Sequence, residues 1–175
     1  MRRLMLLRHA KSDWPAHIKD HERPLSPRGR KASPLMGGYM AAEGLLPDQV
    51  LVSTVRRTQE TWDLARPAFA QDIARTNEKR LYDAAADTIL EVIRQAPSGA
   101  RTLLVVGHNP GLQDLALKLI GNADQADLVR LRRKYPTAGL VVIDFDIEDW
   151  SGADAGTGRL DRFTTPRKCG QLSEP

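Results

Sequence analysis

Three short segments of the chain, two with a histidine and one with a pair of arginines, carry side chains that suit phosphoryl transfer. The first is Arg8-His9-Ala10-Lys11-Ser12. A neutral imidazole is a competent nucleophile when one ring N–H is held by an acceptor and the other nitrogen is free. Nearby cations disfavour imidazolium and also attract a phosphate dianion. We therefore interpret His9 as a candidate nucleophile and Arg8 as a candidate phosphate ligand.

The other two segments offer further groups for binding an anion. Ser53 to Thr61 contains Arg57 where a loop enters a predicted helix, and exposed backbone N–H groups and the helix dipole favour anions at such a point. The planar guanidinium also fits phosphate oxygens. In Gly107-His108-Asn109-Pro110-Gly111, glycine allows close approach of the backbone and His108 can donate to a phosphoryl oxygen. Taken singly, each segment also fits a structural interpretation: a buried histidine, surface arginines, or a capped helix.

The elements that must position these segments follow an alternating strand and helix pattern, which is typical of an α/β fold with a largely parallel sheet. Continuous apolar runs predict buried strands at Leu4 to Leu7, Val50 to Val52, Leu103 to Val106 and Leu140 to Phe145, and Arg159 to Thr164 is a candidate edge strand. Each of the three segments directly follows one of these strands. Because the carboxyl ends of parallel strands form the ligand crevice of such sheets, the three segments are expected to converge in space.

Helix signals lie between the strands. Ser26 is predicted to cap a helix that begins at Pro27 and ends near Gly44. A second helix is expected from about Arg57 to Phe69, a third around Ile89 to Ile93, and a fourth from Pro110 to Ile120 with Asn109 as its cap. Residues 121 to 137 are expected to hold a short helix. The glycine-, alanine- and aspartate-rich residues 148 to 158 are expected to form a surface loop.

At these residues the sequence resembles the histidine phosphatase superfamily, which has the phosphoglycerate mutase-like fold. The family's Arg-His-Gly signature corresponds to Arg8-His9-Ala10, its second block corresponds to Ser53 through Thr61, and its late histidine corresponds to His108. The chain is most similar to the short SixA-type phosphohistidine phosphatases, which share Arg-His-Ala and the run Arg23-Pro24-Leu25-Ser26 followed by Arg28-Gly29.

A length of 175 residues suits one domain, over residues 1–175. The resemblance, which spans roughly residues 3 to 145, implies a three-layer α/β/α sandwich with a mostly parallel central sheet, and no metal or other cofactor. It implies that His9 is phosphorylated and that Arg8, Arg57 and His108 bind the phosphoryl group, with Arg57 selected over Arg56 by spacing. Three positions depart from the wider family: Ala10 replaces glycine, Pro15 replaces a phosphate-binding asparagine, and the glutamate acid corresponds to Asp83 in Leu81-Tyr82-Asp83. Asp83 is thus the candidate acid, and a solvated aspartate before a helix is the alternative.

Composition limits the partners and the location. The net charge is +4, but the densest basic run, Arg130 to Lys134, has only Tyr135 beside it. Without a series of aromatic residues to stack bases, we expect a solvated basic face, next an acidic phosphate-bearing partner, and no nucleic acid. The apolar run Leu4 to Leu7, which follows Met1-Arg2-Arg3, stops at Arg8 and is too short for the apolar region of a signal peptide. We therefore expect a cytoplasmic protein without a membrane span. Cys169 is the single cysteine and cannot form an internal disulfide.

The sequence therefore predicts a metal-independent phosphatase that acts on phosphohistidine of a protein in signal transduction. The first alternative is a phosphatase of small phosphomonoesters, or a mutase. The others are a metal-dependent hydrolase using His9, Asp13 and His108, and a phosphoprotein-binding module without turnover. No spacing among these residues matches a helix-borne zinc pair.

Overall fold

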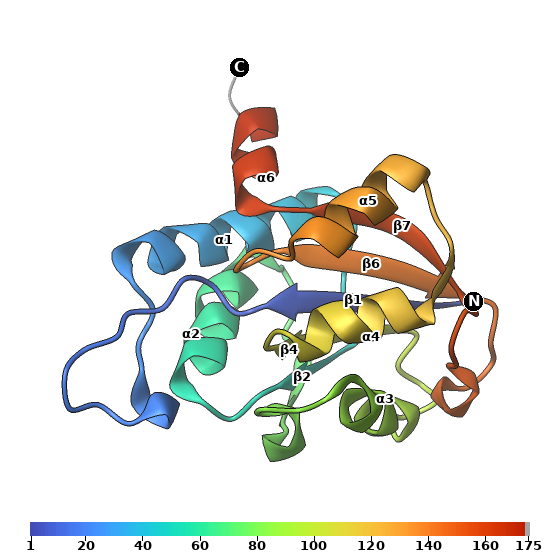
Figure 1. Ribbon diagram of the computed structural model, residues 1–175, viewed down its shortest axis with the longest axis horizontal. Helices are drawn as coiled ribbons and strands as arrows, with labels where there is room; N and C mark the ends of the chain where they lie inside the picture. Colours follow the sequence, from blue (N-terminus) through green and yellow to red (C-terminus); the bar gives the residue numbers. More distant parts are fainter. Residues whose placement is uncertain (174–175) are drawn as a thin grey trace.

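The first strand, β1 (Arg2–Arg8), lies at the centre of the sheet because both of its faces are apolar. Met5 and Leu7 face one helical layer, whereas Leu4 and Leu6 face the other. The computed structural model describes residues 1–173, and within them the strands form one seven-stranded sheet in the order β3-β2-β4-β1-β6-β7-β5. This arrangement confirms the predicted mostly parallel α/β fold (Figure 1).

The remaining strands are β2 (Gln49–Val52), β3 (Ala74–Asn77), β4 (Thr102–Gly107), β5 (Ile120–Asn122), β6 (Leu140–Phe145) and β7 (Gly158–Thr164). β6 is antiparallel to both of its neighbours, β1 and β7, while the other pairs are parallel. The predicted edge strand is β7, but β5 pairs with its outer side, so β7 is not at the edge. β3 and β5 were not predicted, because both strands are short and have no continuous apolar run.

Helices cover both faces of the sheet in three layers. The longer helices are α1 (Pro27–Ala42), α2 (Arg56–Ala65), α3 (Ala86–Arg94), α4 (Gly111–Leu119), α5 (Gln125–Arg133) and α6 (Pro166–Ser173). Short 3-10 turns are η1 (Asp20–Glu22), η2 (Arg66–Ala68), η3 (Lys79–Leu81) and η4 (Trp150–Gly152). Side chains of α1, α2 and α6 share one apolar core, and side chains of α3, α4 and α5 share the other.

Most helix boundaries agree with the predicted signals. Ser26 caps α1 by accepting a hydrogen bond from the Gly29 N–H at 3.1 Å. The second helix is shorter than predicted, because Pro67 confines the chain beyond Ala65 to a 3-10 turn. The fourth starts at Gly111, one residue later than predicted, and the Asn109 side chain accepts from the Gln113 N–H at 3.2 Å.

Two segments differ from the expectations. Residues 148 to 158 are not wholly a surface loop, because Trp150 in η4 is fully buried and its indole N–H donates to the Ala100 carbonyl. The predicted helices did not include α6, which buries Cys169 and thereby raises the pKa of its thiol. Within the described residues, no helix is both long enough and apolar enough to cross a membrane.

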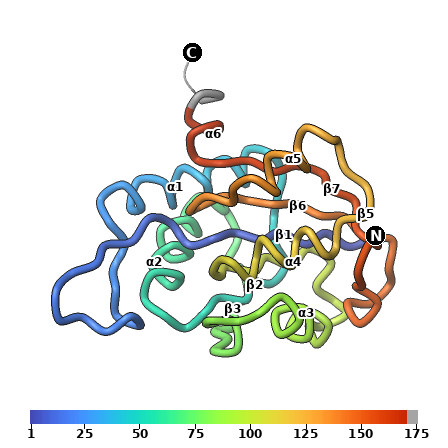
Figure 2. Tube along the Cα trace, in the orientation of Figure 1, coloured from blue at the N-terminus to red at the C-terminus, as the bar shows by residue number. Residues whose placement is uncertain are grey.

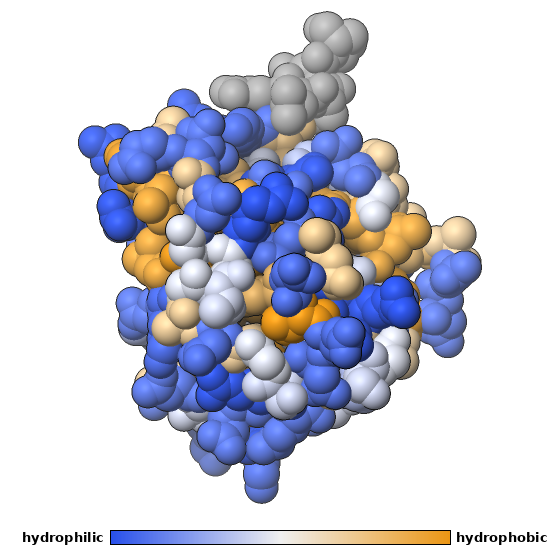
Figure 3. Space-filling model, turned by 90° about the vertical axis from the view of Figure 1, so that its right-hand side faces the viewer, coloured by the Kyte–Doolittle hydropathy of each residue, from blue (hydrophilic) through white to orange (hydrophobic). Residues whose placement is uncertain are grey.

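The three predicted segments follow β1, β2 and β4, which run in the same direction and end at one edge of the sheet (Figure 2). Because β6 runs the opposite way, the segment that precedes it also arrives at this edge. The opposite end of the molecule, seen in Figure 3, is largely hydrophilic, with apolar side chains in small separate areas. The fold thus brings the histidines and arginines of the three segments together at the carboxyl edge of the sheet.

Candidate active site

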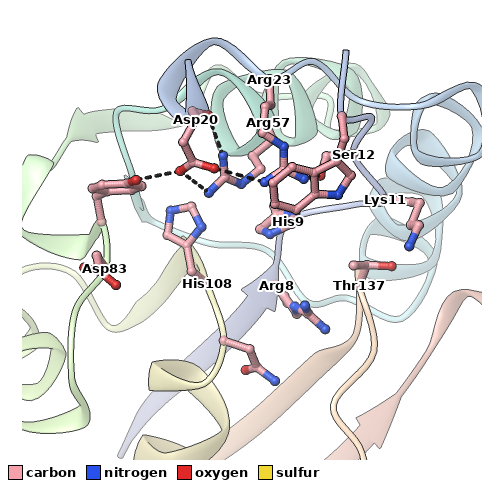
Figure 4. Close-up of a pocket in the computed structure, with 13 residues that line it drawn as sticks. Arg8, His9, Lys11, Ser12, Asp20, Arg23, Arg57, Asp83, His108 and Thr137 are labelled. Atoms are coloured by element: carbon pink, nitrogen blue, oxygen red, sulfur yellow. Dashed lines mark hydrogen bonds and ion pairs between the residues drawn. The ribbon is translucent and has the colours of Figure 1, made fainter. Parts of the chain in front are cut away.

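A cavity of about 370 Å³ lies at the carboxyl ends of β1, β2 and β4. Arg8, His9, Arg57, Asp83 and His108 all line it, so the structure brings together every site residue that the sequence singled out (Figure 4). Arg8-His9, Arg57 and His108 come from segments about fifty residues apart, and the parallel strands place these segments side by side.

His9 is held in one tautomer. Its ring is 8% exposed, and Nδ1 lies 2.8 Å from the carbonyl oxygen of Ala10. A carbonyl can only accept, so Nδ1 must carry the proton. Nε2 has no hydrogen-bond partner among residues 1–173, and it therefore keeps a free lone pair.

The backbone after His9 is fixed by two helices. The Ala10 N–H donates to Thr61 Oγ1 of α2 at 3.0 Å, and the Lys11 carbonyl accepts from the N–H of Ser26 at 2.9 Å. A Cβ on Gly29 would lie 2.1 Å from this carbonyl oxygen, so only glycine lets α1 approach the loop so closely. These contacts hold the acceptor that sets the tautomer of His9.

Burial keeps both cavity histidines neutral. The pKa of His9 is lowered to about 3, chiefly by burial. The hydrogen bond to the Ala10 carbonyl opposes this shift, and the neighbouring His108, Arg57 and Arg8 act in the same direction as burial. Burial also lowers the pKa of His108 to about 4, helped by Arg57 and opposed by Asp20. At neutral pH the His9 imidazole is thus available as a nucleophile.

These pKa values predict how stability depends on pH. In the unfolded chain a histidine takes up a proton near pH 6.5, whereas the folded protein binds it only near pH 3 to 4. The free energy of unfolding should therefore fall as the pH drops from about 6.5 to about 4, by up to about 1.4 kcal/mol per pH unit for each histidine. Urea unfolding at several pH values measures this slope. His108→Gln should make it shallower, and the exposed His17→Gln should not; parallel curves for wild type and His108→Gln would contradict this account.

Arg57 and Arg56 lie in different environments. Arg57 belongs to the buried face of α2, with Thr58, Thr61 and Trp62, and its side chain is 7% exposed. Arg56 is 52% exposed and pairs with Glu60 at 3.5 Å. Helical periodicity thus turns Arg57 into the cavity and Arg56 away from it.

Arg8 approaches the cavity from the opposite side to Arg57 (Figure 4). Its Nη1 donates to the Tyr135 carbonyl at 2.9 Å, in the segment that precedes β6. In the described part of the chain, the buried Nε atoms of Arg8 and Arg57 have no hydrogen-bond partner. Both guanidiniums therefore retain donor capacity beside His9.

His108 is oriented by Ser53. Nε2 of the imidazole lies 2.8 Å from the Ser53 hydroxyl, which is fully buried at the end of β2. The centroids of the His9 and His108 rings are 5.3 Å apart. Ser53, from the second predicted segment, thus positions His108, from the third.

Asp20 is a cavity residue that the sequence analysis missed. Its carboxylate accepts from Arg57 Nη2 at 3.1 Å, from Arg23 Nη1 at 3.0 Å and from the Tyr82 hydroxyl at 2.5 Å. The Tyr82 hydrogen bond, followed by those of Arg23 and Arg57, holds the pKa of Asp20 well below its usual range. Asp20 is therefore ionised at neutral pH, and it orients Arg57 rather than supplying a proton.

Asp83, the candidate acid, lies at the rim of the cavity. It is exposed and has a left-handed backbone with φ of 51°, a conformation that aspartate tolerates better than most residues.

Pro15 is exposed and does not line the cavity, whereas Ser12 and Trp14 do. Arg23 donates to Ser12 Oγ at 2.6 Å, and its guanidinium lies 3.2 Å from the centroid of the Trp14 ring.

The described residues contain no group of three or more histidine, cysteine, aspartate or glutamate side chains that could hold a metal ion. Of the trio considered for metal binding, Asp13 is exposed and does not line the cavity with His9 and His108. The guanidinium groups of Arg8 and Arg57 place positive charge beside His9.

The chain is similar to known proteins. Residues 4–81 match the histidine phosphatase superfamily (branch 1). An uncharacterised protein of Mycobacterium tuberculosis (strain H37Rv) is 39% identical over 163 residues, which are 92% of this chain and 100% of that protein.

Solved structures are also similar. A protein of Agrobacterium tumefaciens, provisionally named phosphohistidine phosphatase SixA, superposes with a TM-score of 0.80 at 29% identity, covering 94% of this chain and 98% of that one. A protein of Nakamurella multipartita with the same provisional name has a TM-score of 0.78 at 26% identity, covering 94% and 96%. The chain belongs to the histidine phosphatase superfamily. Within that superfamily, it is a member of the SixA-type branch.

Proposed function

We propose that the protein is a metal-independent phosphatase that removes phosphoryl groups from phosphohistidine on proteins, through a phosphohistidine formed on His9. We further propose that residues 1–175, of which 174–175 lie outside the described part, act as one domain. The observation that carries the proposal is the single tautomer of His9, with Nε2 unpaired between two guanidiniums. Such a nitrogen beside cations is suited to attack phosphorus.

In the proposed first step, His9 Nε2 attacks the phosphorus of the substrate and the bond from phosphorus to the substrate imidazole breaks. The leaving imidazole, already protonated on its other nitrogen, departs neutral. Arg8, Arg57 and His108 stabilise the equatorial oxygens, which is the main requirement of phosphoryl transfer. In the second step, water attacks the phosphorus and the Nε2–P bond breaks. Inorganic phosphate leaves with both protons of the water, as H2PO4−, and His9 returns to its starting tautomer.

Two features favour a protein-borne phosphohistidine over a small phosphomonoester. A phosphomonoester releases an alkoxide, which needs a positioned acid, and Asp20 is held ionised while Asp83 is exposed. A neutral imidazole leaves without that help. The relative from Agrobacterium, which bears the name of a phosphohistidine phosphatase, supports the same choice.

The test is a substrate panel with purified protein: a phosphohistidine protein, phosphoramidate and common sugar phosphates. We expect kcat/KM to be higher for the substrates with an N–P bond. Asp83→Asn should reduce ester hydrolysis more than phosphohistidine hydrolysis, because general acids contribute about 10²–10⁴-fold where the leaving group needs a proton. If wild type strongly prefers a sugar phosphate and Asp83→Asn cripples that activity, the protein is a small-molecule phosphatase.

Removal of metals should leave turnover nearly unchanged. Guanidiniums supply the positive charge in the proposed mechanism, so no step requires a cation such as Mg²⁺ or Zn²⁺. The measurement is the rate of phosphoramidate hydrolysis before and after dialysis against EDTA. A large loss that Zn²⁺ or Mg²⁺ restores would favour a metallohydrolase instead.

A further inference from the structure

A second cavity, of about 280 Å³, adjoins the first and has a basic wall. Four cations line it: Lys11, Arg28, Lys134 and Arg167. They come from four parts of the chain, namely the loop after β1, the first turn of α1, the residue after α5 and the first turn of α6. We call this cavity the basic groove. Its charge is thus assembled by the tertiary fold and is not visible as a run in the sequence.

The cations of the basic groove lack carboxylate partners. No acidic residue lines the groove, and within residues 1–173 none of the four cations forms an ion pair. Neighbours on the same helices behave differently, since Arg30 pairs with Glu60 and Arg130 with Asp127. Unpaired like charges that converge on one concavity raise the local concentration of anions.

The groove is continuous with the candidate active site, because Lys11 and Thr137 line both cavities. Figure 4 shows these two residues next to each other, on the side of the site away from Asp83. A ligand whose phosphoryl group reaches His9 can therefore place a neighbouring anionic group in the groove.

The exposure of the cations indicates what kind of anion fits. Lys11, Arg28, Lys134 and Arg167 are all exposed, unlike the buried Arg57. A second phosphate of a small molecule calls for convergent, buried donors, as at His9. Separate exposed cations instead suit several carboxylates spread over a protein surface, where complementary charge sets association rate and partner choice.

We propose that the basic groove binds acidic side chains that lie beside the phosphohistidine of the substrate protein. This proposal rests on the proposed function and adds to it the kind of sequence that the enzyme selects. Lys11 at the shared wall contacts the carboxylate nearest the phosphoryl group, and the other three cations contact carboxylates further along.

The test uses two short peptides of equal length, each with one phosphohistidine, flanked in one by Asp and Glu and in the other by Asn and Gln. Wild type should hydrolyse the acidic peptide with the higher kcat/KM, and the difference should shrink as salt is added. The double variant Arg28→Glu/Lys134→Glu should lower kcat/KM for the acidic peptide by about tenfold. Its rate with phosphoramidate, which is too small to reach the groove, should be unchanged and reports correct folding.

The matched control is Arg132→Glu/Arg133→Glu, which changes exposed charges on α5 that do not line the groove. It should retain the preference for the acidic peptide. Equal hydrolysis of the two peptides by wild type, or equal losses in both double variants, would overturn the groove proposal while leaving the proposed function intact. If wild type hydrolyses phosphoramidate but neither peptide, the proposed function itself is wrong and the groove proposal falls with it.

Discussion

His9→Ala should lose at least about 10³-fold in kcat for phosphoramidate, because removal of a nucleophile abolishes the covalent route and leaves only binding and charge stabilisation. The structure distinguishes His9 from its neighbours in the cavity. His108 Nε2 is engaged with Ser53, and Asp20 is engaged with Arg57, Arg23 and Tyr82. His9 Nε2, by contrast, has no hydrogen-bond partner among residues 1–173. The measurement is steady-state hydrolysis, with enzyme concentrations high enough to detect residual turnover.

The control is His17→Ala, which removes an exposed histidine that does not line the cavity. It should retain wild-type kcat, and thermal unfolding should show that both variants are folded. Undiminished turnover by His9→Ala would remove His9 from the mechanism, whatever its burial and tautomer.

Arg57→Ala should damage catalysis far more than Arg56→Ala. A charge-assisted hydrogen bond to the transferring group is worth roughly 1.5–3 kcal/mol, which corresponds to about one to two decades in rate. Arg57 is buried beside the cavity, while Arg56 is half-exposed and pairs with Glu60. Comparison of kcat/KM for the two variants on the same substrate measures the difference.

Arg57→Lys separates charge from geometry. Lysine keeps the positive charge but cannot offer the planar guanidinium that Asp20 orients, so it should recover only part of the lost rate. Equal losses for Arg56→Ala and Arg57→Ala, or a larger loss at Arg56, would show that the helical register assigned to α2 does not decide which arginine acts.

The elements that carry the site could be predicted because their signals are local. Leu4 to Leu7 and Leu103 to Val106 are uninterrupted apolar runs, as burial on both faces of a sheet requires. A histidine follows two residues after the end of each run, so the position of His9 and His108 at one edge followed from the parallel topology. Ser26 before Pro27 likewise marks the start of α1 without reference to the rest of the fold.

Other parts of the site depend on contacts that local patterns do not encode. Asp20 lies in a polar loop without periodicity, and it meets Arg57, 37 residues later, only through tertiary packing. The reversed direction of β6 brings the Tyr135 carbonyl to Arg8. The apolar sequence of β6 predicts a buried strand but does not indicate in which direction that strand runs. The basic groove could not be predicted from the sequence either, because its four cations come from four separate parts of the chain.

The covalent state of His9 during turnover tests the central claim most directly. The enzyme is mixed with phosphoramidate, quenched rapidly without acid so that N–P bonds survive, and analysed by intact mass spectrometry followed by peptide mapping. The account predicts one added phosphoryl group, located on the peptide that contains His9 and absent from His9→Ala. Wild type that turns over under conditions where an intermediate should accumulate, but carries its phosphoryl group on another residue, would contradict it.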